Sequence, residues 1–162
     1  MKERKITLSM KVFASADELS EEDATLLKKA RAFTKESYAP YSHFHVAAAA
    51  LLGNGKIVFG SNQENASFPV SICAERILLA NAAMRFPDVP IATMAITYHN
   101  MQGKSNEPIS PCGMCRQALS EYQQRVGRPM RLLLSGFEGE VYLIENAGAL
   151  LPLTFTGEDL RH

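Results

Sequence analysis

Apolar and polar positions divide the chain into alternating strand-like and helix-like segments. Residues 5–13 alternate imperfectly, which is typical of an edge strand or an ordered N-terminal arm. Ser20 and the acidic residues that follow it mark a helix start, and apolar residues recur at helical spacing over 26–33. We expect this helix to end near Tyr38, because Pro40 pushes the preceding residue out of the helical region.

The middle of the chain shows a hairpin and then a helix. Two apolar segments, 46–52 and 56–60, flank an Asn-Gly pair, which is a strong signal for a β-hairpin. After a polar loop over 61–71, the pattern predicts a helix that begins at Cys73 and ends before Pro87.

The last third continues the alternation. We expect a strand at 92–98, a polar loop at 99–111, a helix at 112–125 that Gly127 ends, and strands at 130–135 and 140–144. Strands that alternate with helices favour an α/β layered sheet. A length of 162 residues without a linker or repeat indicates a single domain.

Charge and hydropathy exclude several classes of protein. Lys plus Arg and Asp plus Glu both number 17, and a net charge of zero disfavours nucleic acid as the main partner. The longest apolar run, 46–52, is far short of the roughly 20 residues that a membrane-spanning helix needs, so no membrane partner is expected. The basic N-terminus lacks the apolar stretch of a signal peptide. Three cysteines do not suggest a disulfide framework, so we expect a cytoplasmic protein.

All three cysteines lie where a helix is predicted to begin. Cys73 starts one helix, and Cys112 and Cys115 share one face of the first turn of the other. Free N–H groups and the dipole at a helix N-terminus favour the thiolate, which is the form that binds zinc. Three protein ligands are typical of a catalytic zinc site, whose fourth position is left for water. No histidine has a spacing that pairs it with the cysteines; the four are His43, His45, His99 and His162.

Glu75 and Arg76 follow Cys73 closely. A carboxylate at Glu75 could shuttle protons for a water in such a site, and Arg76 could offset the net negative charge of zinc with three thiolates. A single cysteine is most often a small buried residue, and a C-x-x-C pair alone could be a redox motif. The combination of C-A-E with P-C-x-x-C is instead the signature of the zinc deaminases.

Five segments, in order, resemble the short-form, homotetrameric cytidine deaminases. They are YAPYSHFHVAAA (38–49), GSNQENASF (60–68), ICAER (72–76), SPCGMCRQALSEY (110–122) and LLPLTFTGEDL (150–160). The resemblance implies a cytidine-deaminase-like three-layer α/β/α fold with a mixed five-stranded sheet over 20–162, after an N-terminal extension at 1–19. It also implies one Zn²⁺ per subunit and a homotetramer whose active sites are completed by neighbouring subunits.

The resemblance assigns chemistry to the residues singled out above. It implies that Cys73, Cys112 and Cys115 hold the zinc. It further implies that Glu75 is the proton shuttle and that Arg76 hydrogen-bonds the ligating thiolates.

It also implies a set of substrate contacts. Phe44 would pack against the pyrimidine, and Asn62 and Glu64 would bind the ribose hydroxyls. Ala66 would contribute backbone contacts, and Phe155 would reach the active site of a neighbouring subunit. A plainer interpretation of Asn62 and Glu64 is that they only make turn hydrogen bonds in a polar loop.

Some positions depart from the family pattern. Ala47 stands where glycine is frequent, Phe68 where tyrosine is common, and Leu153 where glycine is common. The loop at 99–109 also looks longer than usual. These departures bear on substrate range and subunit contacts rather than on the metal chemistry.

The expected function is the hydrolytic deamination of cytidine and 2′-deoxycytidine to uridine and 2′-deoxyuridine, with release of ammonia. Three alternatives stay open. They are a deaminase of cytidine within polynucleotides, a deaminase of a modified nucleoside, and a zinc-binding module without enzymatic activity.

Overall fold

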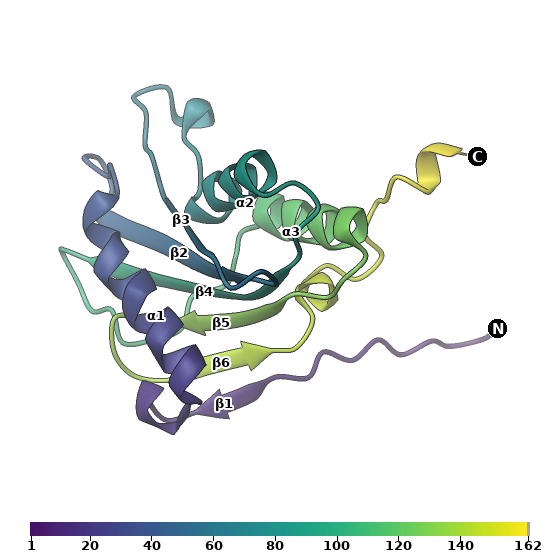
Figure 1. Cartoon of the computed structure of the whole chain (residues 1–162), viewed down its shortest axis with the longest axis horizontal. Helices are drawn as coiled ribbons and strands as arrows, with labels where there is room; N and C mark the ends of the chain where they lie inside the picture. Colours follow the sequence, from purple (N-terminus) through teal and green to yellow (C-terminus); the bar gives the residue numbers. More distant parts are fainter. Residues whose placement is uncertain (162) are drawn as a thin grey trace.

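The computed structural model describes residues 1–161, so His162, one of the four histidines and the end of the expected domain, lies outside the described residues. Its centre is a six-stranded sheet in the order β1-β6-β5-β4-β2-β3 (Figure 1). The strands are β1 (Lys11–Phe13), β2 (Phe44–Leu52), β3 (Ile57–Ser61), β4 (Ile91–Asn100), β5 (Arg131–Ser135) and β6 (Val141–Ile144). The α-helices are α1 (Glu21–Phe33), α2 (Ala74–Arg85) and α3 (Gly113–Val126). β4 and β5 are parallel, and the other neighbouring pairs are antiparallel.

The expectation of five strands was wrong, because the N-terminal extension adds a sixth. β1 pairs with β6, placing Lys11 opposite Leu143. Phe13 packs against an apolar cluster beneath α1, and Lys11 Nζ lies 2.7 Å from a carboxylate oxygen of Glu145. The alternating segment 5–13 therefore forms an edge strand of only three residues, which these two contacts hold to the sheet.

β2 is an interior strand of the sheet, and its sequence reflects that position. It lies between β3 and β4, and Ala47, Ala48, Ala49 and Ala50 are all fully buried. Ala48 and Ala50 pack in one apolar cluster with α2 and α3, whereas Ala49 packs in a second cluster with α1. The helices thus cover opposite faces of the sheet, as Figure 1 shows. The absence of polar alternation in this strand follows from burial on both faces.

Local signals set the boundaries of the elements. The predicted hairpin joins β2 to β3, and Gly55 takes the positive φ of +78° that its turn requires. The hydroxyl of Ser20 accepts a hydrogen bond from the backbone N–H of Asp23 and caps α1. α1 ends at Phe33, five residues before Tyr38, because the next turn tightens into a 3₁₀ helix at Thr34–Glu36.

Gly127 ends α3 in the left-handed conformation, as predicted. Within residues 1–161, no helix combines the length and the apolar character needed to cross a membrane.

Candidate active site

The N-termini of α2 and α3 bring the three cysteines together. Cys73 and Cys112 are the residues that precede α2 and α3, and Cys115 lies in the first turn of α3. Cys112 Sγ is 3.4 Å from Cys115 Sγ and 3.9 Å from Cys73 Sγ. All three sulfurs lie within 4.8 Å of one another, although 39 residues separate Cys73 from Cys112 in sequence.

The spacing of the sulfurs fits a zinc ion. Zinc–sulfur bonds of about 2.3 Å at a tetrahedral angle place two sulfurs about 3.8 Å apart. The separations of 3.4 and 3.9 Å bracket this value. No histidine, aspartate or glutamate of residues 1–161 joins the cluster as a fourth donor. The donor set is therefore that of an open zinc site rather than a closed structural one.

The thiol pKa values of Cys73 and Cys115 are shifted in opposite directions. Hydrogen bonding from Cys115, then from Cys112, and the positive charge of Arg76 lower the pKa of Cys73 to about 6. The hydrogen bond to Cys73, together with burial, raises the pKa of Cys115. Cys73 is thus the cysteine of the pair with Cys115 that loses its proton more readily, and a thiolate is the form that captures a cation.

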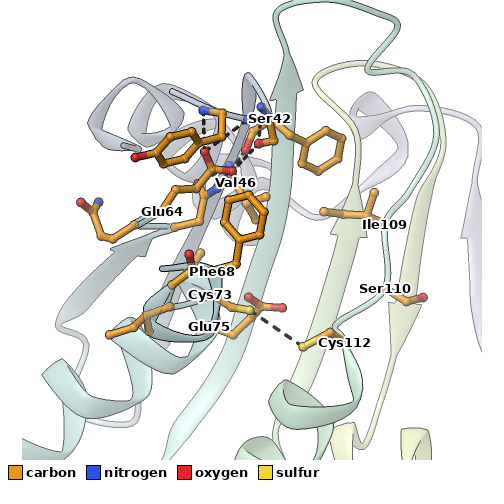
Figure 2. Close-up of a pocket in the computed structure, with 16 residues that line it drawn as sticks. Ser42, Val46, Glu64, Phe68, Cys73, Glu75, Ile109, Ser110 and Cys112 are labelled. Carbon is orange, nitrogen blue, oxygen red and sulfur yellow. Dashed lines mark hydrogen bonds between the residues drawn. The ribbon is translucent and has the colours of Figure 1, made fainter. Parts of the chain in front are cut away.

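Glu75 lies beside the sulfurs as a buried carboxyl group. Only 5% of its surface is exposed, and burial, with the charge of Cys73, raises its pKa. Figure 2 shows the Glu75 carboxylate next to the sulfur of Cys73, on the same wall of a cavity. A carboxyl group in this environment can hold a proton and release it to a nearby group.

The cavity has a volume of about 710 Å³. The sulfurs of Cys73 and Cys112 lie at one end, and Ser42 and Glu64 lie at the other, with Ile109 facing them across the opening (Figure 2). The only charged residues on its wall, within residues 1–161, are Glu64 and Glu75, apart from the cysteines. No lysine, arginine or histidine of the described chain lines it. The cavity is therefore suited to a ligand without negative charge.

Asn62 uses most of its amide to hold the backbone of β2. Its Oδ1 accepts from the N–H of Val46 at 2.8 Å, and its Nδ2 donates to the carbonyl of Phe44 at 2.9 Å. An amide nitrogen has two hydrogens, so one remains for a ligand in the cavity. These bonds reach a strand 16 and 18 residues away in sequence rather than a local turn, and the remaining hydrogen is free for the predicted binding role.

Glu64 is held by the segment that precedes β2. Its Oε1 accepts from the hydroxyl of Ser42, and its Oε2 accepts from the N–H of Tyr41 at 2.9 Å and of Ser42 at 3.3 Å. Desolvation opposes ionisation, but these hydrogen bonds prevail and lower the pKa of Glu64. The carboxylate is therefore ionised and fixed at the rim of the cavity.

Phe44 forms an aromatic part of the cavity wall. Its ring stacks on Tyr98 of β4, with centroids 4.5 Å apart and an interplanar angle of 16°. Tyr98 is 94% buried, so it supports Phe44 from behind. A flat ring held in this way can stack against a heterocyclic base.

Four of the expected site residues do not line the cavity. Cys115 is fully buried behind it, and the other three lie outside it. Ala66 is exposed on the loop after Glu64. Arg76 influences Cys73 through its charge, but it makes no hydrogen bond to a sulfur within the described residues. Phe155 is 60% exposed, and its carbonyl accepts a hydrogen bond from Gln117 of α3 at 2.9 Å.

Two residues that sequence reasoning missed support the site. Arg116 donates to the carbonyls of Pro111 and Leu150, at 2.9 and 3.2 Å, and fixes the chain that enters α3. A positive charge in the first turn of a helix is unfavourable for the helix dipole. The position of Arg116 in the sequence therefore indicated that this side chain has a role other than stabilising the helix. Ser42 holds Glu64, and its position two residues before Phe44 is typical of a hydroxyl that bonds the backbone locally.

The structure shows where the residues that depart from the family pattern lie. Leu153 has φ +58°, a left-handed conformation that favours glycine, and its side chain is 93% exposed. Phe68 lines the cavity and meets Tyr41 edge-on, with ring centroids 6.0 Å apart. The loop after β4 contacts the β5–β6 turn, where Ser105 O accepts a hydrogen bond from Glu138 N at 3.2 Å, and His99 near the end of β4 stacks on Phe137 with ring centroids 4.6 Å apart.

Comparison with known proteins gives a consistent result. Residues 20–127 match the family described as the cytidine and deoxycytidylate deaminase zinc-binding region. A cytidine deaminase of Halalkalibacterium halodurans is 36% identical over 137 residues, which cover 83% of this chain and 95% of that protein. One from Mycoplasma genitalium is 39% identical over 100 residues, which cover 62% of this chain and 72% of that protein.

Solved structures show the same similarity. The crystal structure of a cytidine deaminase from Burkholderia pseudomallei superposes with a TM-score of 0.69 at 34% identity, covering 85% of this chain and all of that one. A cytidine deaminase from Mycobacterium leprae gives a TM-score of 0.63 at 28% identity, covering 83% of this chain and 99% of that one. The α/β sheet with its helices is thus shared with these enzymes.

Proposed function

The chain belongs to the cytidine and deoxycytidylate deaminase family, and we propose that it hydrolyses cytidine and 2′-deoxycytidine to uridine and 2′-deoxyuridine, releasing ammonia. It is a hydrolytic deaminase whose cofactor is zinc, held by Cys73, Cys112 and Cys115 with one ion per chain. One observation carries the proposal most directly. A buried carboxyl group, Glu75, shares a cavity wall with the sulfur cluster.

Glu75 moves the protons that the reaction requires. When bound, zinc supplies Lewis acidity that lowers the pKa of a water molecule to about 7. Glu75 takes a proton from the attacking water and delivers it to ring nitrogen 3 of cytosine, which makes carbon 4 electrophilic. The oxygen adds to carbon 4, and Glu75 then carries a second proton to the amino group, which leaves as ammonia. Burial of Glu75 suits this cycle, because the carboxyl must accept and release a proton in turn.

The charge of the cavity favours a nucleoside over a nucleotide. A phosphate group is usually held by arginine, lysine or backbone N–H groups at a helix N-terminus. The described residues that line this cavity include no cation, and they include the carboxylates of Glu64 and Glu75. The same charge distribution counts against a polynucleotide, whose binding needs a positively charged groove.

The proposal is tested with the zinc-loaded full chain and an ammonia assay. The substrates are cytidine, 2′-deoxycytidine, deoxycytidine 5′-monophosphate, cytosine, modified cytidines and single-stranded DNA. We expect turnover of both nucleosides, kcat/KM at least about 100-fold lower for the monophosphate, and loss of activity on zinc chelation that added zinc restores. Zinc binding without ammonia release would instead identify a non-enzymatic module. Preference for a modified nucleoside or for DNA would support the corresponding alternative.

We propose that Phe44, Asn62 and Glu64 bind the substrate, Phe44 by stacking on the pyrimidine and the other two through the sugar hydroxyls. An amide donor next to a carboxylate acceptor matches the hydroxyls of a sugar. Glu64 and the sulfurs of Cys73 and Cys112 lie at opposite ends of one cavity, an arrangement that can hold a base at one end and a sugar at the other (Figure 2). We assign backbone contacts to Ala66 and compensation of the thiolate charge to Arg76, on the basis of the resemblance and of the Arg76 charge near Cys73.

Glu64→Gln is expected to raise KM for cytidine about 10-fold and to change kcat less than about threefold. The amide loses the charge that strengthens a hydrogen bond to a hydroxyl by about 1.4 kcal/mol, and its NH₂ group opposes the donors of Tyr41 and Ser42. Turnover of cytosine, which has no sugar, should not change. Steady-state kinetics on both substrates measure the effect, with Glu107→Gln in an exposed loop as the control. An equal loss on cytosine would show that Glu64 does not bind the sugar.

We further propose a cytoplasmic homotetramer built from one deaminase domain, 20–162, that follows the extension at 1–19. Leu153 and Phe155 support the assembly, because both are exposed apolar residues on a tail that a hydrogen bond fixes to α3. A tail in this position can place Phe155 at the active site of a neighbouring subunit.

A further inference from the structure

We infer that Ser42 is a positioning residue for the substrate sugar, because its hydroxyl fixes the Glu64 carboxylate and the backbone of Phe44 at the same time. The inference rests on the proposed function of Glu64. It concerns a residue that does not itself contact the reacting atoms.

Ser42 restrains a side chain that would otherwise move. Glu64 lies at the rim of the cavity, and a free glutamate side chain loses about 1.5–2 kcal/mol of rotamer entropy when it is fixed. The hydroxyl and the N–H of Ser42, with the N–H of Tyr41, donate to both carboxylate oxygens. Figure 2 shows this bonded group at the end of the cavity away from the sulfurs. The Glu64 side chain is therefore already ordered when the substrate binds, so binding does not cost its rotamer entropy.

The same oxygen connects the sugar end of the site to the base end. Ser42 Oγ accepts a hydrogen bond from the N–H of Phe44 at 3.1 Å while it donates to Glu64. Phe44 in turn stacks on Tyr98. One hydroxyl thus sets the distance between the carboxylate and the aromatic ring, which are the groups proposed for the sugar and the pyrimidine.

The backbone around Ser42 is shaped for this arrangement. His43, between Ser42 and Phe44, has φ +54°, a left-handed conformation that costs a residue other than glycine about 1 kcal/mol. Two backbone hydrogen bonds hold it there, from His43 N to Ala39 O and from Met101 N to His43 O, both 3.0 Å long. Strain that neighbouring contacts maintain is typical of functional sites. Here it turns the Ser42 hydroxyl towards Glu64 and the Phe44 N–H towards that hydroxyl.

A purely local role for Ser42 predicts a different outcome. Serine hydroxyls often bond the backbone two residues ahead in turns that have no contact with a ligand. Removing such a hydroxyl lowers stability but affects all substrates equally. A positioning role instead predicts an effect that depends on the sugar.

The test compares Ser42→Ala and Ser42→Thr in the zinc-loaded full chain, with cytidine and cytosine as substrates. We expect Ser42→Ala to raise KM for cytidine about fivefold and to leave kcat within twofold. The kcat/KM for cytosine should fall less than about twofold, because stacking on Tyr98 still holds the Phe44 ring when its N–H loses the Ser42 hydroxyl. Ser42→Thr should restore most of the KM, because it keeps the hydroxyl. Ser67→Ala is the matched control, since the Ser67 hydroxyl makes no hydrogen bond within residues 1–161 and does not line the cavity.

Two further measurements separate this inference from the proposed function. In the double variant Ser42→Ala/Glu64→Gln, KM should be no higher than in Glu64→Gln alone, because Ser42 acts through Glu64. Crystal structures of the wild type and of Ser42→Ala should show one Glu64 rotamer and several, respectively. Additive effects on KM, or an unmoved Glu64 in Ser42→Ala, would overturn the inference. Absence of cytidine turnover in the wild type would overturn the proposed function, while the rotamers of Glu64 would still decide whether Ser42 holds it.

Discussion

Replacing Glu75 with glutamine is expected to lower kcat for cytidine about 10³-fold, the range that positioned acid–base groups contribute. Glutamine keeps the volume and polarity of the buried side chain, so the fold and the sulfur cluster should be preserved. It cannot accept and release a proton, so both proton transfers in the proposed reaction fail. Steady-state kinetics measure kcat, and metal analysis measures the zinc content, which should stay at about one ion per chain.

Glu121→Gln, an exposed position on α3, is the control for the loss of a carboxylate and should behave like the wild type. Cytidine binding can be followed by calorimetry in Glu75→Gln, since the substrate is consumed very slowly. We expect binding within a few-fold of the KM of the wild type. If the variant turned over cytidine at a near-normal rate, Glu75 would have no part in the proton transfers. If the variant lost its zinc, the assignment of roles between Glu75 and the cysteines would need revision.

Gly60→Ala is expected to damage both stability and catalysis, although Gly60 contacts no substrate. A Cβ atom at this position of β3 would lie 2.3 Å from the carbonyl oxygen of Ala74 and 2.5 Å from the N–H nitrogen of Leu78. Both atoms belong to the backbone of α2, so relief requires the whole helix to move. We expect the free energy of unfolding to fall by about 3 kcal/mol.

The displacement of α2 also affects the site, because Cys73 precedes this helix and Glu75 lies in its first turn. A misplacement of about 1 Å can cost about 100-fold in rate, and we expect kcat/KM to fall by that order in Gly60→Ala. Urea unfolding measures the free energy of unfolding, and steady-state kinetics measure kcat/KM. Gly157→Ala is the control, because a Cβ atom at Gly157 has no neighbour within 4 Å. A stable and fully active Gly60→Ala protein would show that α2 can shift without disturbing the sulfurs.

The sequence predicted those parts of the fold that short-range signals determine. The Asn-Gly pair specified the β2–β3 hairpin, Ser20 specified the start of α1, and Gly127 specified the end of α3. The cysteines were predicted at helix starts because a polar loop gives way to a helical pattern at each of them. Resemblance to a known family then supplied what local patterns do not contain, namely that two helix starts far apart in sequence meet.

Long-range contacts account for what was missed. The alternation over 5–13 indicated an edge strand or an ordered arm, whereas the resemblance implied only five strands. The pattern did not contain its partners, which are β6 in the sheet and Glu145, 134 residues from Lys11. The hydrogen bonds of Asn62 and Glu64 depend on the close approach of the segment after β3 to β2 and to the residues just before it. A residue pattern reports how a side chain relates to its neighbours in sequence, and these partners are not neighbours in sequence.

We expect the short distances among the sulfurs to make the metal-free protein sensitive to air. Cys112 is exposed, and its sulfur is 3.4 Å from that of Cys115. An oxidant that removes two electrons and two protons from this pair forms a disulfide, which no longer offers thiolates to a cation. Bound zinc protects the pair, because its thiolates are already engaged. A chelator removes the zinc, and oxygen can then convert the cysteine pair to a disulfide that no longer binds it. A reductant therefore has to be present whenever the zinc is removed.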